Sequence, residues 1–129
     1  MKQYFKKFCA ATILCTILGL PIIVFAASYT SSFNFDTTLT GSTRSFNGSN
    51  INLKTVSKSS GHTAASSRYF TVALYRKNTI GSSYVGEASF LRDGTSNKTW
   101  TNVGSGKYYF YFSKGFDGRY VKGTATMYN

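Results

Sequence analysis

Alternation of apolar and polar residues dominates the chain beyond residue 26, and no helical apolar period interrupts it. In residues 68–76, for example, Phe70, Val72 and Leu74 share one face of an extended strand. Glycine turn signals such as Asn47-Gly48 separate the alternating segments. This pattern predicts an all-β fold, an antiparallel β-sandwich of about seven short strands.

We expect these strands over residues 33–39, 51–54, 68–76, 84–91, 98–103, 107–113 and 120–128. The small, polar residues 57–67 predict a loop. Besides the apolar face of residues 68–76, we expect Phe110 and Phe112 in the core. Basic residues within strands typically protect sheet edges from pairing with other chains. Lys54, Arg76 and Lys122 are the candidates for this role.

The N-terminal segment has the pattern of a secretory signal peptide. Three lysines precede an apolar and small run over residues 8–20, Pro21 follows, and Val24 and Ala26 stand at positions −3 and −1 of a cleavage site. We therefore predict a signal peptide over residues 1–26 and one secreted domain over residues 27–129. A membrane anchor over residues 8–25 and a lipid anchor at Cys15 are weaker alternatives.

Cleavage at this site would remove both cysteines, so we expect neither a disulfide nor thiol chemistry in the domain. The remaining 103 residues suffice for one hydrophobic core. Twelve Lys and Arg residues stand against four acids, a net charge of about +8. Because the basic residues are scattered, they predict a positive field that attracts anionic polymers. The alternative is that the charge only keeps the protein soluble.

Residues for catalysis are few. His62 is the only histidine and lies in a Ser/Gly-rich segment far in sequence from most carboxylates, whereas a catalytic triad needs an orienting acid. Asp93 and Asp117 each precede glycine, which is typical of turns. Asp36 and Glu87 alternate away from apolar neighbours, and no cluster resembles a metal site. We therefore expect no enzyme activity, no cofactor and no bound metal.

The aromatic run over residues 108–112 is the strongest candidate for a binding surface. If Phe110 faces the core, Tyr109 and Tyr111 point outward, where they either pack on neighbouring strands or form a flat aromatic contact surface. Two flanking lysines, Lys107 and Lys114, would favour anionic glycans. The single tryptophan, Trp100, is either a core residue or a further ligand contact.

The segment over residues 100–112, WTNVGSGKYYFYF, resembles small jelly-roll modules of the pre-peptidase C-terminal type. In that family a strand like residues 70–75 is followed by a Gly-x-Tyr-Tyr strand, as at residues 106–109. The resemblance covers about 45 residues and implies a β-sandwich that assists binding to polymers. The clustered acids with which such modules hold calcium are missing here. The whole chain also resembles short, stand-alone secreted proteins of Gram-positive bacteria.

These observations together predict a secreted, cationic, non-enzymatic binding protein of the cell envelope or matrix. The expected partner is an anionic or neutral polysaccharide. The alternative is an antibacterial, bacteriocin-like or membrane-active protein that reaches anionic lipid through an amphipathic hairpin over residues 107–122. Nucleic acid is not a favoured partner, although the charge would allow contact with it.

Overall fold

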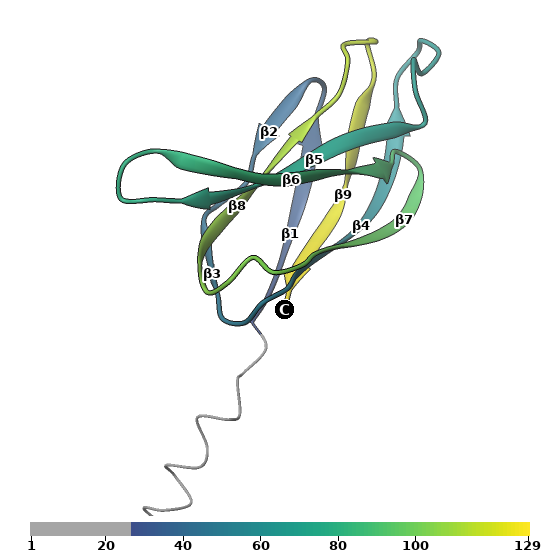
Figure 1. Cartoon of the computed structure of the whole chain (residues 1–129). Helices are drawn as coiled ribbons and strands as arrows, with labels where there is room; N and C mark the ends of the chain where they lie inside the picture. Colours follow the sequence, from purple (N-terminus) through teal and green to yellow (C-terminus); the bar gives the residue numbers. More distant parts are fainter. Residues whose placement is uncertain (1–26) are drawn as a thin grey trace, which may run out of the picture.

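The computed structural model of the protein describes residues 27–129, and the predicted signal peptide lies outside these described residues. Two antiparallel sheets face each other, as Figure 1 shows, which confirms the predicted β-sandwich. No helix able to cross a membrane occurs in the described part of the chain. Residues 27–129 form nine strands rather than the seven predicted: β1 (Ser28–Phe35), β2 (Thr38–Thr40), β3 (Arg44–Phe46), β4 (Ile51–Ser60), β5 (Tyr69–Lys77), β6 (Ser82–Leu91), β7 (Gly94–Trp100), β8 (Gly106–Ser113) and β9 (Tyr120–Tyr128).

The strands divide between a sheet of order β1-β9-β4-β7, here called sheet A, and a sheet of order β2-β8-β5-β6, here called sheet B. Strand β3 also pairs with β8 and so belongs to sheet B. The hairpin of β5 and β6 projects sideways from the sandwich, whereas the β4–β5 and β8–β9 loops lie together at one end (Figure 1). The described chain begins and ends side by side, because the Ala27 nitrogen donates to the Asn129 side chain over 2.8 Å.

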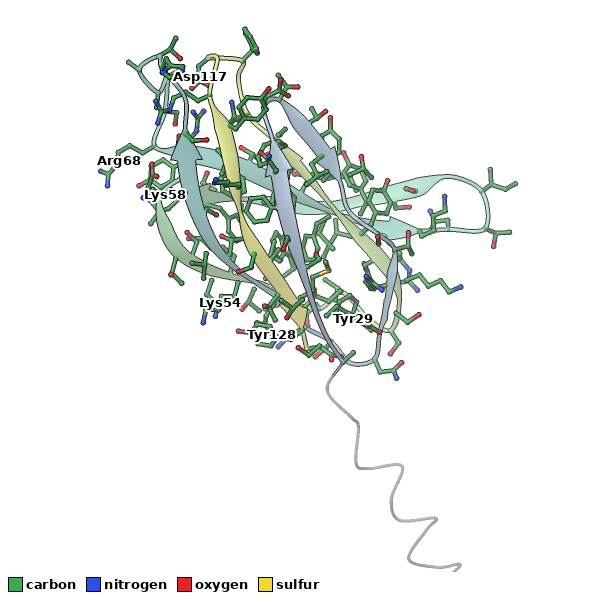
Figure 2. All side chains as sticks on the ribbon, turned by 180° about the vertical axis from the view of Figure 1, so that it is seen from behind. Tyr29, Lys54, Lys58, Arg68, Asp117 and Tyr128 are labelled. Atoms are coloured by element: carbon green, nitrogen blue, oxygen red, sulfur yellow. The ribbon has the colours of Figure 1, made fainter. Side chains whose placement is uncertain are left out.

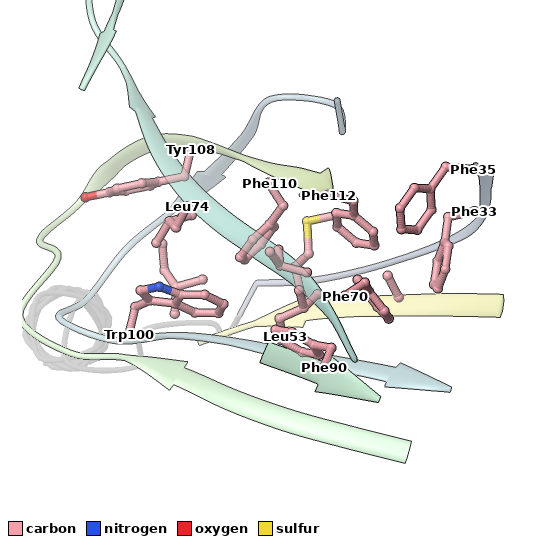
Figure 3. Close-up of a cluster of buried hydrophobic side chains, with 14 of the residues drawn as sticks. Phe33, Phe35, Leu53, Phe70, Leu74, Phe90, Trp100, Tyr108, Phe110 and Phe112 are labelled. Atoms are coloured by element: carbon pink, nitrogen blue, oxygen red, sulfur yellow. The ribbon is translucent and has the colours of Figure 1, made fainter. Parts of the chain in front are cut away.

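The core fills the space between the sheets and is largely aromatic (Figure 3). Phe70, Val72, Leu74, Phe110 and Phe112 are all buried, as the alternation predicts. Ring contacts connect the two sheets. Phe33 of sheet A packs edge-on against Phe112 of sheet B with 5.2 Å between the ring centroids. Burying such large side chains supplies the main stabilisation of a domain without disulfides.

Three predicted boundaries are wrong. The strand expected over residues 33–39 is two strands, because the chain passes from sheet A to sheet B at Asp36 and Thr37. The predicted loop over residues 57–67 begins only after Ser60, since β4 continues its pairing with β9 up to that residue. The strand expected over residues 98–103 runs instead from Gly94 to Trp100.

The predicted edge protection is also wrong. Lys54 and Lys122 lie on the interior strands β4 and β9 of sheet A, and Arg76 lies on the interior strand β5 of sheet B. Lys54 and Lys58 project from the outer side of β4 in Figure 2. Lys58 pairs in register with Lys122 of β9, so two like charges stand directly opposite each other. Sheet A therefore presents lysines in the middle of its outer face.

Candidate functional site

Four tyrosines form a continuous aromatic surface on the outer face of sheet B, here called the tyrosine face: Tyr75, Tyr84, Tyr109 and Tyr111. Tyr75 of β5 is its centre. The Tyr109 ring stacks on it with 5.4 Å between centroids and 9° between ring planes. The Tyr84 and Tyr111 rings meet it edge-on at 5.7 Å and 6.4 Å.

Strand pairing places these rings. Tyr75 is the register partner of Tyr109 on β8 and of Tyr84 on β6, and residues paired in this way project to the same side of a sheet. The alternation that buries Phe110 turns Tyr109 and Tyr111 outward. Opposite the step from Leu74 to Tyr75, β6 has a β-bulge in which Val85 is the extra residue. The bulge brings Tyr84 into register with Tyr75.

The edge of the tyrosine face is open to solvent. The Tyr84 side chain is about half exposed, and its hydroxyl donates to the Glu87 carboxylate over 3.2 Å. Desolvation and the Glu87 carboxylate raise the pKa of Tyr84 above its ordinary value of 10.0, although a tyrosine hydroxyl is a neutral donor near neutral pH even without this shift. Lys107 is exposed at the start of β8, on the same face as Tyr109. The surface thus combines flat rings, hydroxyls and a positive charge.

Trp100 does not contribute to this surface. The indole is buried, stacks on Phe90 at 6.3 Å and contacts Phe110 at 5.3 Å, so the prediction of a ligand contact is corrected (Figure 3). Gly86 of β6 borders the indole, and a β-carbon there would lie 3.4 Å from the ring, at van der Waals distance. The tryptophan therefore joins the sheets inside the core.

Lys114 is also removed from the candidate site. Its side chain is fully buried, and Nζ lies 3.0 Å from Oδ1 of Asp117. The other carboxylate oxygen of Asp117 lies 2.5 Å from Nη1 of Arg92, a side chain that is buried as well. A lysine bound in this way has no free charge for an anionic glycan, so the prediction for Lys114 is corrected.

Asp117 is the centre of a polar cluster that ties loops together at one end of the sandwich (Figure 2). It accepts hydrogen bonds from the backbone nitrogen and the hydroxyl of Ser66 in the β4–β5 loop. It also accepts from the backbone nitrogen of Arg119, which is the turn role expected of it. The Ser66 backbone, followed by Arg92 and Lys114, holds the pKa of Asp117 well below its ordinary value. The cluster binds its own loops and is structural.

The described residues contain no group of three or more His, Cys, Asp or Glu side chains that could hold a metal ion. His62 is exposed in the β4–β5 loop, and no hydrogen bond within residues 27–129 joins it to a serine or a carboxylate. Glu87 is exposed, as predicted, while Asp93 accepts from the Ser59 backbone nitrogen at 2.8 Å.

Sequence reasoning found half of the tyrosine face and missed Tyr75 and Tyr84. The alternation of residues 68–76 already turns Tyr75 to the outward side of its strand. The alternation does not show that β5 and β8 are adjacent in the sheet, because β6 and β7 separate them along the chain. Only that pairing shows that Tyr75 and Tyr109 stack.

No protein-family model and no curated protein matches the chain. Several solved structures are similar to it in fold. One is PliG of Aeromonas hydrophila, a periplasmic inhibitor of g-type lysozyme, with 14% identity over 81% of this chain and 86% of that chain and a TM-score of 0.43. A Bacillus endospore appendage, a disulfide-linked pilus, has 9% identity over 80% of this chain and 86% of that chain, with a TM-score of 0.40. The SPBc2 prophage-derived protein YomS has 13% identity over 82% of this chain and 98% of that chain, also with a TM-score of 0.40. No family match supports the resemblance to the pre-peptidase C-terminal modules.

Proposed function

We propose that the protein is a secreted, non-enzymatic binding protein and that it holds a polysaccharide chain against the tyrosine face of sheet B. The observation that carries this proposal is the contact of Tyr75 with three other tyrosine rings across three adjacent strands. Exposed, contiguous aromatic area usually marks an interaction site. Secretion is the part of the proposal that follows from the pattern of residues 1–26.

The shape and chemistry of the face suit a chain of sugar rings. Tyrosine rings give a large, rigid contact area at a low cost in side-chain entropy, and each hydroxyl can exchange hydrogen bonds with a ligand hydroxyl. Thr40 of β2 pairs with Tyr111 and adds a further hydroxyl beside the rings. Lys107 adds a positive charge at the edge, so an anionic chain gains attraction that a neutral chain lacks.

The alternative of a membrane-active protein depended on an amphipathic hairpin over residues 107–122, and the fold does not support this hairpin. Residues 107–122 do not form a hairpin, because β8 belongs to sheet B and β9 to sheet A. Two of the cations on this segment are also occupied: Lys114 binds Asp117, and Arg119 donates to the Ser59 hydroxyl over 2.9 Å. Lys107 and Lys122 at the two ends of the segment are exposed, but they lie on different sheets, so the segment does not present them on one interfacial hairpin.

The test is a pull-down of the secreted protein on purified, insoluble cell walls, comparing wild type with the double variant Tyr84→Ser, Tyr111→Ser. We expect the double variant to keep the circular dichroism of the wild type and to lose most wall binding. The matched control is Tyr120→Ser. Tyr120 is also about half exposed but lies on the outer face of sheet A, because its neighbour Val121 is buried. Undiminished binding by the folded double variant, or equal loss in Tyr120→Ser, would contradict the proposal.

A further inference from the structure

The edge of sheet B that faces β1 is interrupted. Strands β2 and β3 both pair with β8, but β2 ends at Thr40 and β3 begins only at Arg44. Between them the Gly41 nitrogen donates to the Phe110 carbonyl oxygen over 2.8 Å. Gly41 allows this approach, since a β-carbon there would lie 3.2 Å from the same oxygen. The interruption leaves an opening into the space between the sheets.

A pocket of about 190 Å³ lies at this opening, between β1 of sheet A and the β2–β3 edge of sheet B. Its inner wall is apolar and includes Phe110, Phe112 and Met127, all of which belong to the core. Its polar lining includes the hydroxyl residue Ser31 and the cation Arg44. The volume exceeds the roughly 150 Å³ of an engineered cavity that takes up benzene, and it is smaller than the roughly 300 Å³ at which drug-sized sites begin.

Among residues 27–129, the side chain of Arg44 lies beside an aromatic ring and has no polar partner. Its guanidinium carbon lies 5.0 Å from the centre of the Tyr29 ring, and the Tyr29 hydroxyl is itself fixed by donating to the Ser45 carbonyl oxygen over 3.1 Å. The Nε atom of Arg44 is buried and has no hydrogen-bond partner in the described part of the chain. Both ion pairs within residues 27–129 belong to Asp117, which Figure 2 places at the opposite end of the sandwich from Tyr29.

An arginine in this setting is suited to an anion. The buried Nε is out of a ligand's reach, so the donors available to a ligand are the two Nη groups, which take part in no hydrogen bond within residues 27–129. An anion on these groups would form charge-assisted hydrogen bonds, which are stronger than neutral ones. The planar guanidinium presents paired N–H groups that match a carboxylate, and its carbon lies over the Tyr29 ring, a contact that favours this position of the side chain. The adjoining apolar wall would exclude water from such a pair and would accept a hydrocarbon group.

We propose that this pocket binds a small monocarboxylate, with the carboxylate on Arg44 and a short apolar body between the sheets. The site is separate from the tyrosine face, because the pocket opens on the inner side of β8 and the tyrosines project from its outer side. The proposal therefore does not depend on polysaccharide binding. Its failure and that of the tyrosine face would be seen in different variants.

The experiment is an NMR titration of the ¹⁵N-labelled secreted protein with hexanoate, and with 1-hexanol as the neutral counterpart. An aliphatic probe avoids stacking on the tyrosine face. We expect hexanoate to shift the amide signals of residues 39–44 and Met127, with an affinity at least about tenfold higher than that of 1-hexanol. Equal affinities, or hexanoate shifts confined to other residues, would overturn the proposal.

Variants separate the guanidinium from general charge. Arg44→Gln should bring the two affinities to within about twofold, whereas Arg44→Lys should keep part of the preference for hexanoate. Lys107→Gln is the matched control, because it removes one positive charge from the outer side of β8 and should change neither affinity. An equal loss of preference in Lys107→Gln would overturn the proposal. If Arg44→Gln does not fold, the preference for hexanoate over 1-hexanol in wild type, Arg44→Lys and Lys107→Gln still tests the proposal.

Discussion

Arg92 and Asp117 form a buried ion pair, 2.5 Å between Nη1 and Oδ2, although they belong to two different turns of the sandwich. Arg92 follows β6 and also donates through Nε to the Tyr69 carbonyl oxygen over 3.0 Å. Asp117 lies in the connection that carries the chain from sheet B to sheet A. The pair therefore joins the β6–β7 turn to the β8–β9 loop at one end of the molecule.

The first prediction is a loss of stability in acid through Asp117. Its pKa in the fold lies well below the ordinary value of 3.8, so its contribution is fully present above about pH 5 and is lost as the pH falls. At neutral pH, Asp117→Asn should lower the free energy of unfolding by about 3–5 kcal/mol, because it leaves two buried cations without a partner. Urea denaturation at pH values from 2 to 7, in steps of about one unit, measures both effects.

The difference between Asp117→Asn and wild type should shrink below about pH 4, where the unfolded carboxyl is increasingly protonated. Glu87→Gln is the control, because Glu87 is exposed and its loss should leave the acid limb of the stability profile nearly unchanged. A constant difference between Asp117→Asn and wild type from pH 7 down to pH 2 would contradict the linkage.

The second prediction concerns the two faces of β8. Phe110 is buried against Trp100, so Phe110→Ala should lower the free energy of unfolding by about 3–5 kcal/mol through lost burial and a residual cavity. Tyr111→Ala should cost clearly less, since that ring is partly exposed and meets Tyr75 only edge-on. Thermal unfolding of both variants followed by circular dichroism checks this order. The reverse order would mean that the faces are assigned wrongly.

The alternation of apolar and polar residues predicts the fold class and the core, but it does not show where the chain crosses from one sheet to the other. Phe33, Phe35 and Leu39 continue one apolar pattern even though the chain changes sheet at Asp36. In a sandwich, both sheets turn their apolar residues to the same interior, so a crossing leaves the pattern unchanged. The single predicted strand over residues 33–39 follows from this ambiguity.

The end of β4 was missed for a different reason. Ser57 and Ser59 occupy inward positions, and a run of small polar residues ordinarily predicts a loop. The strand continues because its backbone pairs with β9 at residues 120–123, a partner about 60 residues away. Tertiary pairing of this kind overrides local propensity.

In the candidate site, too, local features follow from the sequence and contacts between separate elements do not. The outward direction of Tyr109 and Tyr111 follows from the period of a strand, which is local. The pairing of Lys114 with Asp117 joins residues only three positions apart, but it depends on the course of the β8–β9 loop, which alternation does not give. The burial of Trp100 depends on Phe90 and Phe110 of the opposite sheet. Sequence alone therefore locates the strand that carries the site but not the full set of its residues.

The third prediction uses the like-charge pair on sheet A. Lys58 and Lys122 stand directly opposite each other on β4 and β9, an arrangement that destabilises a sheet. Lys58→Glu should therefore raise the free energy of unfolding by about 0.2–1 kcal/mol, and high salt should reduce the gain. Lys54→Glu is the control, because Lys54 faces the neutral Thr126. Thermal melts at low and high salt measure the effect, and an equal gain in both variants would instead reflect lower net charge.

The fourth prediction separates the general positive field from the tyrosine face. Retention of the protein on heparin, an anionic polysaccharide, should fall steeply between low and physiological ionic strength, because scattered charges act through screened attraction. Binding to a neutral wall polysaccharide through the tyrosine face should change little with salt, since ring contacts and hydroxyl hydrogen bonds are not screened.

The double variant Lys58→Gln, Lys122→Gln should elute from heparin at lower salt than wild type and bind the neutral polysaccharide normally. The double variant Tyr84→Ser, Tyr111→Ser keeps every charge, so it should elute from heparin close to wild type and lose the neutral polysaccharide. Elution salt and pull-down yield measure the two activities on the same preparations. If the tyrosine variant lost heparin retention as fully as it lost the neutral ligand, one surface would serve both ligands and the positive field would be incidental.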